Sequence, residues 1–193
     1  MIKGYQGTPY QDEKIAGGAQ CIPGRMYCAY YDLGGEGVAY HDSDACNHGS
    51  GSLNPADGSY LNQFRMEEGV DISYIKEKDR TPGSSYLADL GTLYTGWSAA
   101  GEWMNYTVAV QTTGTYQVDI VYATMDGGQL TVQIDGADAG VVSLPPTNGY
   151  HNWGKVDNCA RLALSAGEQV VTLRPHSQGM NYAWLEFTLL PSA

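Results

Sequence analysis

Residues 116–124 read YQVDIVYAT, and this stretch decides the fold. Apolar and polar side chains alternate in it with a period near two, and Val, Ile and Tyr dominate. Both features are typical of a β-strand that buries one face. The same pattern returns at QLTVQID, residues 129–135. The sequence therefore predicts a protein built from β-strands.

Further strand candidates lie on both sides of this stretch. They are VDISYI (70–75), EWMNYTVAV (102–110), QVVTLRP (169–175) and YAWLEFTLL (182–190). Turn signals separate the candidates, at Thr113-Gly114, Asp126-Gly127-Gly128, Asp135-Gly136 and Ala166-Gly167. The strands flanking Gly127-Gly128 are expected to form a hairpin. Since no segment carries a long amphipathic helix pattern, the spacing of these short strands predicts an all-β fold, a β-sandwich or jelly roll.

Two regions lack a clear strand pattern. Residues 1–20 are polar and Gly-rich, which predicts a linker or N-terminal tail ahead of a sandwich domain at 21–191. Residues 41–92 are rich in Gly, Asn, Ser and Asp. A loop of that length inside a compact domain is usually functional or held in place by other parts of the protein.

The composition excludes several classes of partner. The formal net charge is −11, and only 10 Lys and Arg residues are present, without clustering. Nucleic acids and anionic membranes both require basic patches, so neither is expected as a partner. Tyr occurs 15 times and Phe twice, which indicates aromatic rings that also meet water or polar groups.

Four cysteines are present, at Cys21, Cys28, Cys46 and Cys159. No C-x-x-C pair occurs, so a zinc site is not expected. An even number favours disulfides in a secreted protein, with three possible connectivities. The preferred one joins Cys21 to Cys28 across the Pro23-Gly24 turn and Cys46 to Cys159; the alternative is free buried thiols.

The segment TNGYHNWGKV, residues 147–156, places two large aromatics and two hydrogen-bonding side chains together. It is compatible with a loop that covers a core and with a surface that binds a ligand. The residues alone leave the same choice open for Trp97, a core or an exposed ring, and for Asn181, a turn residue or a ligand contact. Trp103, Trp153 and Trp184 are assigned to the core, and His41 and His151 to loops.

Several segments together resemble the family 6 carbohydrate-binding modules. They are GGEGVAYHDSD (34–44), EGVDI (68–72), LYTGWSAAGEWMNYTVAV (93–110), GTYQVDIVYA (114–123), NGYHNWGKV (148–156) and MNYAWLEF (180–187). HGSGSLNPADGSYLNQFR (48–65) resembles the extended loop of a subgroup. The resemblance implies a jelly-roll β-sandwich of two antiparallel sheets, a sugar-binding cleft among loops at one edge, and attachment to a secreted glycoside hydrolase.

The resemblance also implies the binding residues. Two facing rings clamp a sugar and an Asn lies at the base, which matches Trp97, Tyr150 and Asn181, with Trp153 turned into the sandwich. The expected ligand is a plant or algal cell-wall polysaccharide, a β-glucan or a xylan. A flat aromatic ring covers the C–H face of a pyranose, and Asn offers a donor and an acceptor to its hydroxyls.

Family members usually hold a structural calcium ion, but this sequence departs from their ligand pattern. Tyr27, Ala29 and Ala183 stand where the family has carboxylates, and a hard cation needs about six oxygen ligands. The usual calcium is therefore expected to be weak or absent. An acidic loop with Glu36, Asp42, Asp44 and Asp71 remains a weak candidate for another cation; a solvated loop is the alternative.

A binding module is favoured over an enzyme. The carboxylates Glu67, Glu68, Asp71 and Glu102 show no spacing that pairs two of them as glycosidase chemistry requires. The alternatives are a stand-alone lectin or adhesin and, less favoured, a small β-sandwich glycoside hydrolase. We expect a secreted monomer without a catalytic site.

Overall fold

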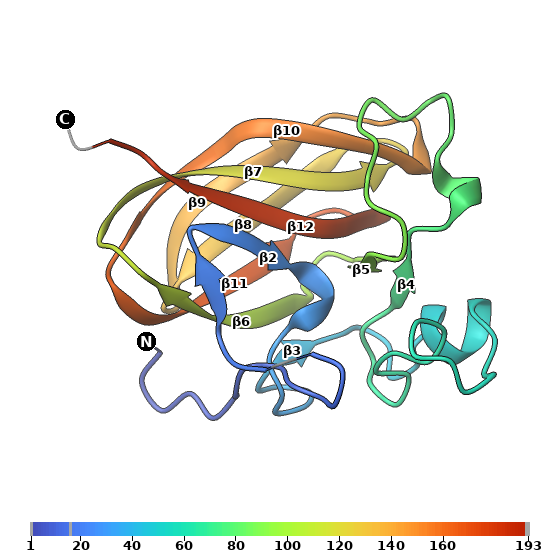
Figure 1. The fold of residues 1–193 in the computed structure, drawn as a ribbon, viewed down its shortest axis with the longest axis horizontal. Helices are drawn as coiled ribbons and strands as arrows, with labels where there is room; N and C mark the ends of the chain where they lie inside the picture. The colour runs from blue at the N-terminus through green and yellow to red at the C-terminus, as the bar shows by residue number, and fades with distance from the viewer. Residues whose placement is uncertain (1, 16, 192–193) are drawn as a thin grey trace.

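The computed structural model describes residues 2–15 and 17–191. Two six-stranded sheets lie face to face as a sandwich (Figure 1). One sheet has the order β1-β6-β11-β8-β9 with β3 against β6, and the other has β10-β7-β12-β5-β4 with β2 against β12. The strands are β1 (Gln20–Ile22), β2 (Gly24–Tyr27), β3 (Tyr40–His41), β4 (Ile72–Tyr74), β5 (Leu93–Thr95), β6 (Trp103–Val110), β7 (Gly114–Thr124), β8 (Gly128–Ile134), β9 (Ala137–Leu144), β10 (Gly149–Leu164), β11 (Gly167–Pro175) and β12 (Met180–Leu189).

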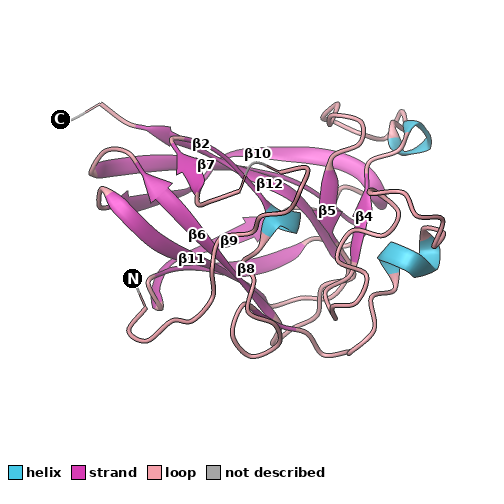
Figure 2. Cartoon of the chain, turned by 60° about the horizontal axis from the view of Figure 1, so that its bottom comes forward, coloured by secondary structure: helices cyan, strands magenta, loops and turns pink. Residues whose placement is uncertain are grey.

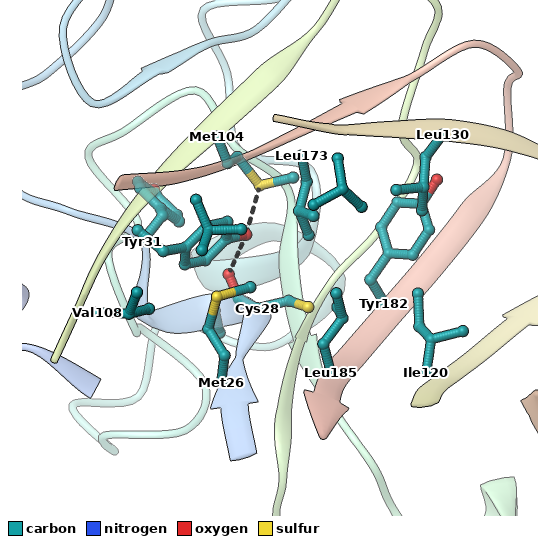
Figure 3. Close-up of a cluster of buried hydrophobic side chains, with 14 of the residues drawn as sticks. Met26, Cys28, Tyr31, Met104, Val108, Ile120, Leu130, Leu173, Tyr182 and Leu185 are labelled. Carbon is teal, nitrogen blue, oxygen red and sulfur yellow. Dashed lines mark hydrogen bonds between the residues drawn. The ribbon is translucent and has the colours of Figure 1, made fainter. Parts of the chain in front are cut away.

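The main core fills the space between the two sheets. Side chains from both layers meet there, among them Met104 of β6, Leu173 of β11 and Leu185 of β12 (Figure 3). Burying this many apolar side chains is the main favourable term in folding. The Tyr106 hydroxyl, also buried, donates to the Cys28 carbonyl oxygen at 2.9 Å, so its polar end is satisfied inside the core.

The prediction of an all-β sandwich is confirmed. Residues 116–124 fall inside β7, and each of the other strand candidates overlaps a strand. Helical structure in the described chain is confined to short turns, η1 (Cys28–Tyr30), η2 (Gly49–Leu53) and η3 (Glu77–Asp79) (Figure 2). No helix among these residues is long and apolar enough to cross a membrane. The sheets are antiparallel except where β1 pairs parallel to β6.

The predicted hairpin around Gly127-Gly128 is wrong. The chain crosses there from one sheet to the other: β7 pairs with β10 and β12, whereas β8 pairs with β9 and β11. The two-residue hairpin lies one strand later, at Asp135-Gly136, which joins β8 to β9. These residues have φ angles of +52° and +82°. Positive φ at both central positions is the mark of the tight turn that Asp-Gly favours.

Two long strands were not predicted. β9 reads ADAGVVSL, which carries little alternation. β10 has 16 residues and pairs with β7, but its register shifts twice, between Gly149 and Gly154 and between Val156 and Ala160. Each bulge inserts unpaired residues and breaks the period of two. The TNGYHNWGKV segment therefore forms the irregular start of a strand rather than a free loop.

The segment predicted as a linker is packed against the domain within its described residues. Thr8 exchanges two backbone hydrogen bonds with Leu33, at 2.9 and 2.7 Å. Tyr10 is 8% exposed and stacks on Tyr30, with ring centroids 5.6 Å apart. The Tyr5 hydroxyl donates to buried Asp32 at 2.7 Å. A Gly-rich composition does not show which aromatic residues are buried. The sequence therefore predicted a tail, whereas the structure has a segment that packs against the domain.

The predicted disulfides are also wrong, since all four cysteines carry free thiols. Cys21 is exposed on β1 in one sheet. Cys28 is buried in η1, directly after β2 of the other sheet. The turn between them carries the chain from one sheet to the other, so the two side chains face different environments. Cys46 lies exposed in a loop, and Cys159 lies at the second bulge of β10.

We expect four thiols to react with a thiol reagent under denaturing, non-reducing conditions. In the native protein, exposed Cys21 and Cys46 should react first. Burial raises the pKa of Cys28 and raises the pKa of Cys159 to about 12. Since the thiolate is the reactive species, these two should react slowly. Mass spectrometry of the labelled cysteines measures this order; two or fewer reactive thiols in denaturant would contradict the structure.

Candidate functional site

The three residues expected to bind sugar lie together at the end of the sandwich that carries β5, at the right of Figure 1. Trp97 follows β5, Tyr150 is the second residue of β10, and Asn181 is the second residue of β12. They line one cleft of about 400 Å³, together with His151, Gln178 and Gly179. Residues far apart in the chain thus converge where three strands begin or end.

Trp97 is held in a costly backbone conformation. Its φ is +51°, in the left-handed region that non-Gly residues seldom adopt, and its side chain is 43% exposed. A left-handed conformation costs an L-residue about 1–2 kcal/mol. An exposed indole contributes little core burial to offset that cost. Backbone strain at an exposed aromatic residue is typical of ligand sites, where the position of the ring for binding matters more than the stability of the fold.

Tyr150 is projected by the first bulge of β10. Gly149 pairs with Thr124 and Gly154 pairs with Tyr122, so four residues of β10 lie opposite one residue of β7. Within this bulge Tyr150 is 47% exposed, whereas Trp153 is 1% exposed. The bulge therefore sends one aromatic to the cleft and the other into the core, which is the division that the family resemblance implied.

Asn181 ties the base of the cleft to its wall. It is 5% exposed, and its amide Nδ2 donates to the Tyr150 carbonyl oxygen at 2.6 Å. Its Oδ1 lies close to Gly96, where an added Cβ would come within 2.6 Å of that oxygen. The Trp97 turn can approach Asn181 this closely because residue 96 has no side chain.

The segment before β5 braces the Tyr150 side of the cleft. The Thr81 hydroxyl donates to Asn152 Oδ1 at 2.6 Å. Asn152 Nδ2 in turn donates to the carbonyl oxygens of Thr147 and Asn148. The backbone of Trp153 is bonded on both sides, from its N–H to Ser84 Oγ and from the Tyr86 N–H to its carbonyl. The bulge is therefore preorganised by a region that sequence patterns described only as a long loop.

His151 and Gln178 line the cleft but were not predicted as site residues. His151 had been assigned to a loop, as a surface or hydrogen-bonded residue. Its position next to Tyr150 in the bulge was the only signal available, because neighbouring residues of a bulge can point to the same side.

Comparison with known proteins identifies the chain. The sequence profile described as "Carbohydrate binding module (family 6)" matches residues 64–189. The chain belongs to the family 6 carbohydrate-binding modules. No curated protein matches it. Among solved structures, CsCBM6-3 of Clostridium stercorarium in complex with cellobiose has 15% identity and a TM-score of 0.58, covering 91% of this chain and 100% of that one.

A second similar structure is a β-1,3-glucan-binding family 6 module of Bacillus halodurans. Its identity is 17% and its TM-score 0.55, with 88% of this chain and 98% of that chain covered. These likenesses confirm the β-sandwich. Since modules of this family are non-catalytic, the chain is a binding module and not an enzyme.

Two of the carboxylates considered for catalysis, Glu102 and Glu68, have structural partners in the module. Glu102 Oε2 accepts from the Ala99 N–H at 2.7 Å, and its Oε1 accepts from the Ser43 hydroxyl at 2.6 Å. Glu68 pairs with Arg65 at 2.9 Å. Glu102 therefore braces the loop that follows Trp97.

Of the three tryptophans assigned to the core of the module, two are fully buried. Trp153 is 1% exposed and Trp184 is 0% exposed. Trp103 is only half-buried, with its ring 6.4 Å from that of His41. Its assignment to the core was wrong, because the first residue of β6 lies at the sheet end.

The acidic loop contains close carboxylate–histidine contacts and backbone hydrogen bonds. Glu36 lies 2.5 Å from His41 Nδ1, and Asp44 lies 3.0 Å from His48 Nε2. Asp71 accepts from the His48 N–H. Across the described residues, no three acidic, His or Cys side chains come close enough to hold a metal ion. The weak candidates Glu36, Asp42, Asp44 and Asp71 thus form a network of protein contacts.

The positions of the usual family calcium do not fit a cation in this module. Ala29 and Ala183 are fully buried and offer no side-chain oxygen. The Tyr27 ring lies 6.2 Å from that of Trp184, and the Arg25 guanidinium lies 4.5 Å above the same indole. An aromatic cluster with its own cation occupies a region where a divalent ion would need several carboxylates.

The stability of the module should fall as the pH rises from about 5 to 8. Burial, then the charge of Glu102, raises the pKa of Asp71 to about 6, and burial, Glu102 and Asp71 raise that of Asp42 to about 7. Groups with a raised folded-state pKa stabilise below their unfolded pKa, and this contribution is lost as pH rises through the folded pKa. Thermal melts measure the effect.

Asp71→Asn keeps the acceptor for the His48 N–H and should flatten this pH dependence. Asp126→Asn, in an exposed turn, is the matched control and should leave it unchanged. An Asp71→Asn variant with the same slope as the wild type would show that this cluster does not set the pH response.

Proposed function

We propose that this module binds a β-linked glucan or xylan by clamping one sugar between Trp97 and Tyr150 over Asn181. The observation that carries the proposal is the exposed indole of Trp97 on a strained backbone. Two large rings that are 43% and 47% exposed border one cleft whose base is a nearly buried Asn. Exposed rings grouped over a cleft mark a ligand site more than chance exposure does.

The energetics suit a soluble sugar chain. Covering a pyranose face removes on the order of 100 Å² of apolar surface from water, which contributes about 2.5 kcal/mol. Hydrogen bonds from the sugar hydroxyls to the side-chain oxygen of Asn181 would orient the sugar in the cleft. A site of this kind should bind with a Kd between ~1 mM and ~1 µM. Rings on two sides of a cleft favour single chains over a flat crystal face, which would need coplanar rings.

The biological setting follows from the same proposal. Modules of this family are often appended to glycoside hydrolases, and one similar structure is a family 43 arabinoxylan arabinofuranohydrolase chain. We place this module in a secreted chain, where it would hold an attached hydrolase on plant or algal cell walls. The acidic surface, with a net charge of −11, agrees with a neutral polysaccharide partner.

A polysaccharide array tests the proposal directly. β-1,4-Glucan and β-1,3-glucan come first, because similar modules were solved with cellobiose or are described as binding β-1,3-glucan. Xylan and agarose complete the array. Binding to a β-glucan or xylan that Trp97→Ala abolishes supports the proposal. A wild-type protein that binds only agarose, or none of the four, would refute it.

Asn181→Ala should weaken binding to the best oligosaccharide by about 1–3 kcal/mol. The variant removes the acceptor that faces the sugar and leaves the Tyr150 carbonyl oxygen without its donor. Asn181→Asp keeps an acceptor but sets a carboxylate against that carbonyl, so it should weaken binding as well. Isothermal titration calorimetry measures both variants; wild-type affinity in Asn181→Ala would remove this residue from the site.

A further inference from the structure

Asn148 is the only asparagine in the sequence that is followed by a glycine. It lies in the turn that leads into β10, two residues before Tyr150 of the cleft. The residue is exposed, and no hydrogen bond to its side-chain amide forms within the described residues. An exposed, unbonded amide next to a residue without a side chain is the arrangement in which an asparagine reacts with its own backbone.

The reaction requires water and no other partner. The Gly149 backbone nitrogen loses its proton and attacks the side-chain carbonyl carbon of Asn148. A C–N bond forms, the bond from that carbon to Nδ2 breaks, and Nδ2 leaves as ammonia with one added proton. Water then opens the five-membered succinimide ring at either carbonyl, which gives aspartate or isoaspartate. In isoaspartate the main chain runs through the side-chain carbon. A Cβ at residue 149 would hinder the attack, and glycine has none.

β10 contains a second asparagine that serves for comparison. Asn158 is also exposed, has a φ of +52° against +58° at Asn148, and lies in the second bulge. However, Cys159 follows it, so a Cβ crowds the backbone nitrogen. Its Oδ1 also accepts from Arg161 Nε at 3.2 Å. The two positions therefore share exposure and backbone conformation and differ in the two features that the reaction requires.

The backbone is anchored on both sides of Asn148. Before it, the Thr147 N–H donates to the Thr124 carbonyl oxygen at 3.1 Å. From the other side, Asn152 Nδ2 donates to the carbonyl oxygens of Thr147 and Asn148, at 3.2 and 3.0 Å. Isoaspartate inserts one more carbon atom into the main chain between these anchors and Tyr150. The ring of Tyr150 would then leave the position that the bulge gives it.

We propose that Asn148 is a site of spontaneous modification, where attack by the Gly149 nitrogen produces isoaspartate and thereby weakens sugar binding. The modification depends only on the local chain, whereas its effect on binding rests on the proposed clamp. Aspartate at the same position keeps the length of the main chain and adds only an exposed charge. Isoaspartate is therefore the product that disturbs the cleft.

Peptide mapping of aged protein tests the modification. Wild-type protein is kept for several weeks at mildly acidic and at mildly alkaline pH. The alkaline samples should react faster, because the attacking nitrogen must lose its proton. In an acidic digest, the Asn148 peptide should gain about 1 Da, or about 3 Da in water enriched in ¹⁸O, because a water oxygen replaces the amide nitrogen. The Asn158 peptide should stay unchanged. Asn148→Gln should not react, since its longer side chain would have to close a less favourable six-membered ring.

Calorimetry on separated fractions tests the consequence. Ion exchange separates the modified protein, and methylation by protein isoaspartyl methyltransferase measures its isoaspartate content. Asn148→Asp is the matched control, because it carries the same added charge on a normal backbone. The isoaspartyl fraction should bind the best β-glucan or xylan oligosaccharide about 10- to 100-fold more weakly than fresh wild type, whereas Asn148→Asp should bind within about 2-fold of it.

An unmodified Asn148 in the alkaline samples, or equal reaction of Asn148 and Asn158, would overturn the modification site. Isoaspartyl protein that binds like fresh wild type would overturn the effect on the cleft. If no oligosaccharide binds even fresh wild type, the proposed function and the effect on binding fail together, while the peptide map still decides whether Asn148 reacts.

Discussion

Trp97→Ala is expected to weaken oligosaccharide binding by about 2–3 kcal/mol, or roughly 30- to 150-fold, without lowering the melting temperature. Half of the apolar cover over the sugar is lost with the indole. The folded protein loses little, because the side chain is 43% exposed. Isothermal titration and thermal melts on the same samples measure the two effects separately.

Trp97→Gly tests the backbone strain at the same position. Glycine adopts the φ of +51° at little cost, so this variant should relieve about 1 kcal/mol of strain, which corresponds to a rise in Tm of about 2–4 °C for a domain of this size. Its greater freedom in the unfolded chain offsets part of this gain. Trp103→Ala is the control, since that indole lies outside the cleft and its loss should leave affinity unchanged.

A Trp97→Ala variant that binds normally would remove the first ring from the site. A variant that loses binding together with a large fall in Tm would assign Trp97 to the core instead. The structure predicts neither result, because the indole stacks on no other aromatic ring among the described residues.

Trp153→Ala should act in the opposite way, lowering the free energy of unfolding by about 3–5 kcal/mol. The side chain is 1% exposed, and its ring lies edge-on to Tyr94 with centroids 5.0 Å apart. It belongs to a second buried cluster with Val121 and Trp184. Replacing the indole by a methyl group leaves a cavity that these rigid neighbours cannot fill. For this domain size the Tm should fall by about 6–20 °C.

Tyr150→Ala is the matched variant, three residues away in the same bulge. Its ring is 47% exposed, so the Tm should change little while binding is lost. At temperatures where Trp153→Ala is folded, its affinity should stay near that of the wild type. If Trp153→Ala folds normally but loses binding and Tyr150→Ala binds normally, the roles of the two rings are reversed.

The sequence determined the fold class and much of the cleft. Alternation in residues 116–124 depends only on neighbours along the chain, because side chains of a strand point to opposite faces in turn. That local rule predicted β7, β8, β6 and β12 where the structure has them. Trp97, Tyr150 and Asn181 were found through the family resemblance, since spacing along the chain cannot show that three strand ends meet.

The tertiary structure alone decided which residues face each other. Gly127-Gly128 looked like a hairpin, but pairing between distant strands sends the chain to the opposite sheet. Cys21 and Cys28 are close in sequence, yet the turn between them carries the chain from one sheet to the other. The contact of His151 with Asp79 joins segments between which the chain forms the strands β5 to β9. Which residues face each other is set by the register and the bulges of strands that are distant in the sequence. The energy of these strand pairs comes from burial across the sandwich, so it produces no periodic pattern in the sequence.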